Sequence, residues 1–203
     1  MVPSPATSKG AATREAILDH AYMIAASAGL EGLSIGPLAD AVGMSKSGVF
    51  AHFGSREDLQ LAVLDLAADR FGEHTLIPAL SRPRGLPRLQ ALLENWLTWL
   101  QRDRGGCLLL AAANEYDDRP GPLRDRMVHH HQRLRQMVSR AVAMAVECGA
   151  LRADLDIDQA AFELNAIALA VQNDMAINGP DIATRRGQQM LQRLLAAYTS
   201  PAA

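Results

Sequence analysis

Residues 33–56 read LSIGPLADAVGMSKSGVFAHFGSR, and this stretch predicts two short helices joined by a tight turn. Gly43 stands where a turn between two crossing helices needs a positive φ or a close approach of the backbones. Ser34 and Ser45 each precede an apolar stripe, as helix N-cap residues do. We therefore expect a helix–turn–helix here, although a plain corner of a helical bundle would satisfy the same pattern.

The second of these two helices would present polar and aromatic side chains to solvent. Lys46, Ser47, Phe50 and His52 can all contact DNA, whereas the alternative for Phe50 is a place in the core under the turn. The charge of the region does not attract DNA in bulk, because residues 1–58 hold four basic and six acidic side chains. DNA affinity would therefore depend on where single charges are placed.

In the rest of the chain, apolar residues recur at spacings of three and four, which is typical of helices. Predicted helices cover residues 12–28, 86–102, 107–115, 122–148, 157–177 and 182–198, and a further helix begins after Ser55. Pro78, Pro83 and Pro87 predict a loop or hinge over residues 78–87. No segment alternates with a period of two, so the predicted fold is all-α, with about nine helices and no sheet.

The composition is that of a globular protein with one domain or two small ones. Of its 203 residues, 49% are hydrophobic and 21% are charged, and the formal net charge is −2. The longest apolar run, residues 107–113, is far shorter than the ~20 residues of a membrane span. Two widely spaced cysteines and the absence of a signal-peptide pattern favour the cytoplasm. Nearly all the basic residues are arginines, which we attribute to coding bias rather than to function.

Residues 17–29, 34–43, 45–53 and 55–59 together resemble the TetR family of bacterial helix–turn–helix transcriptional regulators. The resemblance implies a three-helix DNA-binding domain over residues 1–57 and a larger helical ligand-binding and dimerisation domain over residues 58–203. It also implies a homodimer formed through residues 157–198, approximately, and a near-palindromic double-stranded DNA operator. Repression would be relieved by an unidentified small-molecule effector. Phe50 stands where the family usually has tyrosine, which can alter operator preference.

The predicted DNA contacts fall into two kinds. We assign Lys46 and Ser47 mainly to base edges, because lysine can donate to N7 or O6 of guanine, and Phe50 to a thymine methyl group or a sugar. The remaining residues would contact phosphates, partly through backbone N–H groups at helix N-termini. Such contacts position the protein on the DNA but do not specify the base sequence. They are Ser34, Ser45, His52 and Arg56. The full predicted set is Ser34, Ser45, Lys46, Ser47, Phe50, His52 and Arg56.

The larger domain contains side chains that could line a ligand cavity between its helices. Aromatic residues favour a largely apolar ligand, whose orientation a histidine and an amide would fix. The alternative is that these residues are ordinary core. The predicted ligand-binding residues are Trp96, Trp99, Tyr116, His131, Phe162 and Asn165.

No motif in the sequence predicts a metal site, a cofactor or catalysis. His129, His130 and His131 are consecutive, and consecutive helical residues point about 100° apart, so they cannot face one ion. A phosphate-binding glycine loop, a nucleophile elbow and a zinc-protease motif are all absent from the sequence. We therefore expect a regulator rather than an enzyme. An all-α enzyme or a helical interaction module is the alternative class, and DNA binding without ligand control is a third.

Overall fold

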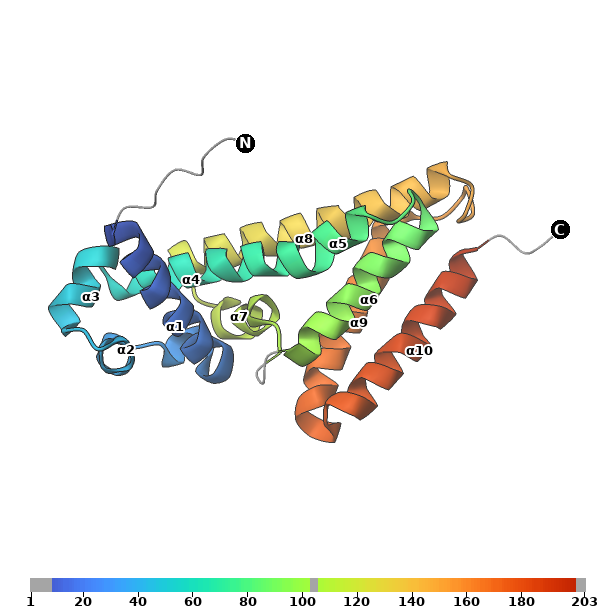
Figure 1. Cartoon of the computed structure of the whole chain (residues 1–203). Helices are drawn as coiled ribbons and strands as arrows, with labels where there is room; N and C mark the ends of the chain where they lie inside the picture. The colour runs from blue at the N-terminus through green and yellow to red at the C-terminus, as the bar shows by residue number, and fades with distance from the viewer. Residues whose placement is uncertain (1–8, 103–105, 200–203) are drawn as a thin grey trace.

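The computed structural model describes residues 9–102 and 106–199, and every regular element within those ranges is helical (Figure 1). In chain order the elements are α1 (Lys9–Gly32), α2 (Ile35–Val42), α3 (Lys46–Phe53), α4 (Arg56–Phe71), the π-helical turn η1 (Gly72–Leu76), α5 (Ile77–Leu80), α6 (Leu86–Arg102), α7 (Leu108–Tyr116), α8 (Pro122–Glu147), α9 (Ile157–Asn178) and α10 (Pro180–Tyr198). Because α4, η1 and α5 follow one another without a break, the described residues form nine continuous helical segments. The all-α fold predicted from the sequence is confirmed.

Helices α1, α2 and α3 form a small N-terminal domain, from which α4 leads into the rest of the chain (Figure 1). Each helix contributes buried apolar residues to its core, among them Ile17 of α1, Leu38 of α2, Val49 of α3 and Leu59 of α4. The position of α3 is set mainly by its packing against α2 and α4. The predicted domain boundary after residue 57 falls in the first turn of α4, and residues 1–8 of that predicted domain lie outside the described residues.

Helix α8 is the centre of the larger domain, where it packs against α4, α6, α7 and α9. In Figure 1, α4 and α5 lie alongside α8, α6 crosses below them, and α9 and α10 form a pair at the end of the molecule away from α3. Helix α7 packs against both α1 and α8 and so joins the two parts of the chain. Within the described residues, no helix combines the length and the apolar character that crossing a bilayer requires.

The predicted loop over residues 78–87 begins later than expected, because the chain stays helical through Pro78 to Leu80. A proline inside an α-helix normally breaks it, since it has no N–H to donate. Here the π-helical turn shifts the bonding pattern, and the N–H of Ile77 donates to the carbonyl of Gly72. Pro78 then lies in the first turn of α5, where no N–H is needed.

The first helix is also longer than predicted. It extends from Lys9 to Gly32 instead of covering residues 12–28, and it is kinked at Gly29, whose φ of 76° is left-handed. The predicted helix end at Gly29 thus coincides with the kink, and one more helical turn follows it. The φ of Gly29 favours glycine, and a β-carbon here would lie 2.6 Å from Oε1 of Glu115 and would displace that carboxylate.

Candidate DNA-binding and effector-binding sites

The turn between α2 and α3 has the geometry that its sequence predicts. Gly43 adopts φ 66° and ψ 32°, and its N–H donates to the carbonyl of Asp40. The hydroxyl of Ser45 accepts from the N–H of Gly48 at 3.1 Å and so caps the first turn of α3. Ser34 has the extended backbone of an N-cap residue, but its hydroxyl makes no capping bond to α2. The start of α3 is therefore the better fixed of the two helix N-termini.

One face of α3 points to solvent and carries the side chains predicted to contact bases. Lys46 and Ser47 are exposed, and 43% of Phe50 is exposed, so its alternative place in the core is excluded. Val49 and Phe53 point inward instead. The structure therefore places a lysine, a serine and an aromatic ring on the open face of a short, capped helix.

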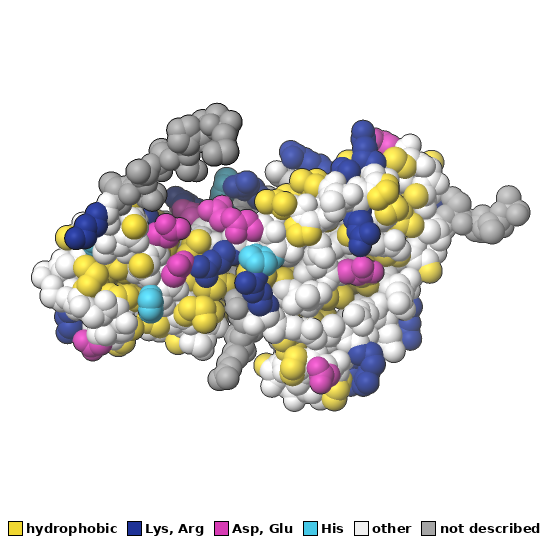
Figure 2. All heavy atoms as spheres, in the orientation of Figure 1, with side chains coloured by type: hydrophobic (Ala, Val, Ile, Leu, Met, Phe, Trp, Pro, Cys, Tyr) yellow, Lys and Arg dark blue, Asp and Glu magenta, His cyan; other side chains and the backbone are white. Residues whose placement is uncertain are grey.

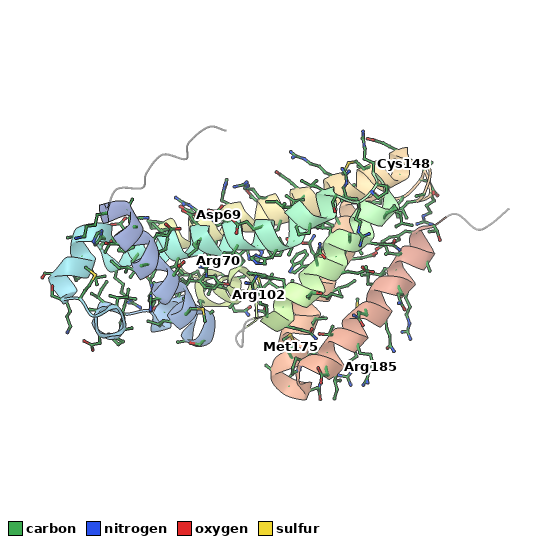
Figure 3. All side chains as sticks on the ribbon, in the orientation of Figure 1. Asp69, Arg70, Arg102, Cys148, Met175 and Arg185 are labelled. Atoms are coloured by element: carbon green, nitrogen blue, oxygen red, sulfur yellow. The ribbon has the colours of Figure 1, made fainter. Side chains whose placement is uncertain are left out.

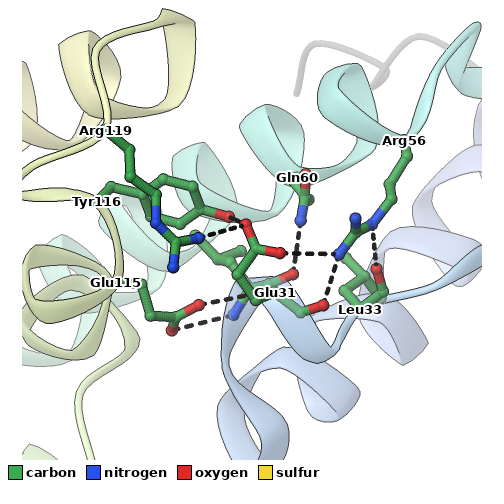
Figure 4. A network of polar contacts seen from close by, with 8 residues as sticks. Glu31, Leu33, Arg56, Gln60, Glu115, Tyr116 and Arg119 are labelled. Atoms are coloured by element: carbon green, nitrogen blue, oxygen red, sulfur yellow. Dashed lines mark hydrogen bonds and ion pairs between the residues drawn. The ribbon is translucent and has the colours of Figure 1, made fainter.

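Arg56 has a structural role that sequence reasoning missed. Its Nε donates to the carbonyl of Leu33 at 2.8 Å, and its Nη2 donates to the carbonyl of Glu31 at 2.5 Å. These bonds attach the first residue of α4 to the segment between α1 and α2 (Figure 4). Nε and Nη2 are thereby committed to protein carbonyls, whereas Nη1 is not bonded to a described residue, so the phosphate contact of Arg56 stays a prediction. His52, predicted for the same role, is half-buried on α3.

The N-terminal domain has no continuous basic surface on the face drawn in Figure 2, where Lys and Arg side chains stand singly among neutral and acidic ones. This agrees with the excess of acidic residues over residues 1–58. Non-specific attraction to DNA scales with the number of phosphates that cations neutralise, so the few cations on this face predict a small contribution from bulk charge.

A polar network joins α7 to the end of α1 (Figure 4). The carboxylate of Glu115 accepts from the backbone N–H of Leu30 at 3.2 Å and from that of Glu31 at 2.8 Å. Tyr116 donates its hydroxyl to Glu31 at 2.9 Å, and Arg119 pairs with the same carboxylate at 3.3 Å. The helical turn that follows the Gly29 kink is therefore held by side chains of the larger domain.

The same network explains the shifted acidities of its two central groups. The hydrogen bond from Tyr116 has the largest effect and lowers the pKa of Glu31. Burial acts in the opposite direction, and the charges of Arg56 and Arg119 lower the pKa further. Burial raises the pKa of Tyr116, and the adjacent Glu31 carboxylate adds to that rise. At neutral pH the carboxylate is thus charged and the phenol is protonated, which are the states their hydrogen bond requires.

Three of the six predicted ligand-binding residues line one cavity. Trp96 of α6, His131 of α8 and Asn165 of α9 surround a space of about 260 Å³. Both polar side chains already have partners: Nε2 of His131 lies 2.8 Å from the carbonyl of Leu109, and Asn165 donates to the carbonyl of Ala161. The indole N–H of Trp96 is buried and makes no hydrogen bond with any described residue.

The other three lie elsewhere, which corrects their assignment to a cavity shared with Trp96. Trp99 lies about one turn from Trp96 on α6 and also contacts Phe71, but it lines a different cavity and packs against His74 with ring centroids 5.1 Å apart. Tyr116 belongs to the network with Glu31. Phe162 is 54% exposed on the outer face of α9. Helical spacing alone did not reveal which neighbour each face would meet.

Sequence reasoning missed a larger cavity of about 340 Å³ between α4, α6 and α8. Its lining includes Arg88, Arg133 and Arg140 together with Asp69. Figure 3 labels Asp69 and the next residue, Arg70, which pairs with Asp19 of α1 instead. Arg133 and Arg140 are seven residues apart beside an apolar stripe of α8, a signal that the sequence did contain. Arg88 lines the same cavity only because α6 crosses α8, and the sequence does not show that crossing.

Comparison with known proteins places this arrangement in a family. The family model for bacterial regulatory proteins of the TetR family matches residues 17–63. A model for a tetracycline-repressor-like C-terminal domain matches residues 85–191, which is more than half of the chain. The chain belongs to the TetR family. It is a transcriptional regulator whose N-terminal helix–turn–helix domain binds DNA, as in other TetR proteins.

Solved TetR-family structures share the fold over nearly the whole chain. A TetR regulator from Chloroflexus aurantiacus is 25% identical, with a TM-score of 0.82, and the match covers 93% of this chain and 94% of that one. A TetR regulator from Cytophaga hutchinsonii is 18% identical, with a TM-score of 0.84 and coverages of 97% and 99%. AibR, solved with isovaleryl coenzyme A and operator DNA, is 20% identical, with a TM-score of 0.71 and coverages of 94% and 100%. No curated protein matches the chain.

Proposed function

We propose that this TetR-family protein is a homodimeric repressor that binds a near-palindromic operator through α3 and leaves it when a small molecule binds the larger domain. The observation that carries the proposal is the outward face of α3, where Lys46, Ser47 and Phe50 lie together on a capped helix. The major groove of DNA admits one α-helix, and the edges of the base pairs are distinguishable there. The outward face of α3 could therefore contact them. Two copies in a dimer would read half-sites about one helical turn apart.

The apolar outer surface of α9 and α10 supports dimerisation. Large hydrophobic side chains are exposed there although both helices pack in their own chain. A helix that is apolar on two faces needs a cover on both. A second copy of the chain would cover this surface and would place the dimer interface within residues 157–198, approximately. The exposed residues are Phe162, Leu169, Ile177, Ile182 and Met190.

The cavities of the larger domain support control by a ligand. The cavity with Trp96, His131 and Asn165 contains the side chains predicted for an effector, and the one between α4, α6 and α8 has a wall formed by the helix that begins in the DNA-binding domain. A structural relative, AibR, has been solved with a coenzyme A ester and operator DNA. A tenfold loss of DNA affinity requires only ~1.4 kcal/mol of preference of the ligand for one conformation.

The decisive experiment is selection of DNA fragments by the protein from its own genome, followed by affinity measurements on the selected site. Replacing Lys46 with Ala should weaken specific binding by about 1–3 kcal/mol, because a base contact is lost, and should weaken random-sequence binding less. Arg84→Ala removes the same charge from the exposed loop between α5 and α6, outside the proposed dimer interface, and should leave both affinities unchanged.

If no fragment is selected, or if Lys46→Ala and Arg84→Ala behave alike on the selected site, the assignment of α3 as the reading element is wrong. A protein that selects DNA but whose affinity no small molecule alters would be a DNA-binding regulator without ligand control. Absence of any sequence-specific binding would favour the remaining class, an all-α enzyme or interaction module.

A further inference from the structure

We propose that the cavity between α4, α6 and α8 binds an amphipathic organic anion, a molecule with an apolar chain and one carboxylate-like head. This inference deepens the effector control proposed above and rests on it only for the consequence on DNA. It concerns the cavity that contains Arg88, Arg133 and Arg140, not the one that contains Trp96, His131 and Asn165.

The charge of this cavity is opposite to that of the chain. Among the described residues that line it, three arginines accompany a single carboxylate, Asp69, so positive charge is in excess by two. The chain as a whole carries a formal net charge of −2. His130 also lines the cavity, but its Nε2 is occupied by Oδ1 of Asp65 at 2.8 Å. The cavity is therefore a local positive site in an acidic protein.

The arginines at the mouth are available to a ligand. Arg133 and Arg140 are exposed on α8, and neither makes a hydrogen bond or an ion pair with any described residue. Arg88 differs, because its Nε and Nη2 both donate to the carbonyl of Arg82 at 3.2 and 3.0 Å. Those two bonds orient its guanidinium and leave Nη1 uncommitted within the described residues. Guanidinium groups bind carboxylates with short, charge-assisted hydrogen bonds.

The inner wall of the cavity is apolar, and a small inorganic ion would not cover it. Helices α4, α6, α7 and α8 all contribute to it, so the wall is shaped by packing and not by one flexible side chain. Its volume of about 340 Å³ lies in the range of small-molecule sites, which are mostly apolar with a few polar groups that orient the ligand. The apolar lining includes Phe71, Leu92, Leu109, Leu134, Met137 and Met144.

These two features together select the ligand class. An inorganic anion would satisfy the arginines but leave the apolar wall wet, whereas a neutral hydrocarbon would leave the positive charges unpaired. A cationic amphipath would be repelled by the excess positive charge. Only an anion with an apolar chain matches both parts.

Decanoate, kept below its micelle-forming concentration, is the probe that tests this inference by titration calorimetry on the full-length protein. We expect decanoate to bind at least about tenfold more tightly than decanol, decylamine or acetate, which lack either the anionic head or the chain. The double variant Arg133→Gln/Arg140→Gln should lose about tenfold in decanoate affinity and keep its affinity for decanol. Circular dichroism would verify that the variant is folded.

Arg135→Gln is the matched control, because Arg135 is on the same helix but lines the cavity with Trp96, His131 and Asn165. It should bind decanoate like the wild type. Decanoate binding that depends on Arg135 and not on Arg133 and Arg140 would overturn the proposal, and so would equal affinities for decanoate and decanol.

A second measurement separates this site from the proposed function. DNA affinity is titrated with and without saturating decanoate, using the selected operator. If decanoate binds through Arg133 and Arg140 but leaves DNA affinity unchanged, the site is real and release of DNA by this ligand class is refuted. If decanoate does not bind while operator binding is intact, the site assignment fails and the DNA-binding function stands.

Discussion

His130 is buried in α8, with only 6% of its surface exposed, and contacts a carboxylate of α4. Its Nε2 lies 2.8 Å from Oδ1 of Asp65, whose other oxygen accepts from Arg126. Burial lowers the pKa of His130 below its ordinary value of 6.5, although Asp65 acts in the opposite direction. The neutral ring then donates from Nε2 to the carboxylate, so one bond joins α8 to the helix that leads from the DNA-binding domain.

The lowered pKa predicts that stability depends on pH below about 6.5. In that range the unfolded chain takes up a proton at this histidine before the folded protein does, so the free energy of unfolding should fall as the pH is lowered from about 7 to about 5. Urea unfolding at several pH values should show a flatter profile for His130→Gln. His20→Gln, a change at an exposed histidine of α1, should keep the wild-type slope. Equal slopes for His130→Gln and the wild type would contradict this explanation.

Phe50 and Arg56 illustrate how far a single residue can be interpreted from its position in a motif. The exposed ring of Phe50 agrees with the prediction that it faces outward from α3. Arg56 was expected to reach a phosphate, yet its guanidinium donates to backbone carbonyls 23 and 25 residues earlier in the chain. Nothing in the local pattern around Arg56 indicates those acceptors.

Helix α9 has an apolar outer face in addition to the face that packs within its own chain. Phe162 and Leu169 of α9 are 54% and 49% exposed, and their spacing of seven residues places them on one face, about two turns apart. Leu164, between them in the sequence, is buried in its own chain. The apolar outer face is therefore distinct from the face that packs internally.

We expect Phe162→Glu/Leu169→Glu to produce a monomer, because a dimer would have to bury four unpaired carboxylates. Sedimentation at micromolar concentration measures the change directly. Ile77→Glu is the control, since Ile77 is 60% exposed on α5, outside the predicted interface, and its replacement should leave the dimer intact. A wild-type protein that sediments as a monomer would refute the homodimer itself.

At the scale of the whole molecule, the contact of α7 with the end of α1 connects the two domains. Glu115 accepts from the backbone N–H groups of Leu30 and Glu31, which follow the Gly29 kink at the end of α1. We expect Glu115→Ala to lower the free energy of unfolding by about 1–3 kcal/mol, the cost of leaving such donors unsatisfied. Hydrogen exchange at Leu30 and Glu31 should become faster.

Glu147→Ala is the matched control for that change. Glu147 forms an exposed ion pair with Arg84 at 3.2 Å, and such pairs contribute about 0–1 kcal/mol. If Glu115→Ala and Glu147→Ala have equally small effects on stability and exchange, then Glu115 does not hold the domains together.

The sequence by itself determined the helices, the α2–α3 turn and the outward face of α3. These features depend on residues only a few positions apart, so they can be predicted from the sequence. They are the Gly43 turn, the Ser45 cap and the apolar spacing. The cap of α9 is equally local, because Asp156 accepts from the N–H of Gln159, three residues later.

The tertiary structure alone decided which distant side chains meet. Trp96 faces a cavity and Tyr116 faces Glu31 because of how α6 and α7 are rotated against their neighbours, and rotation depends on packing across the whole larger domain. The same is true of Arg88, which joins Arg133 and Arg140 only where α6 crosses α8. Periodicity shows that a helix has a buried face, but the residues opposite that face come from elements far away in the chain.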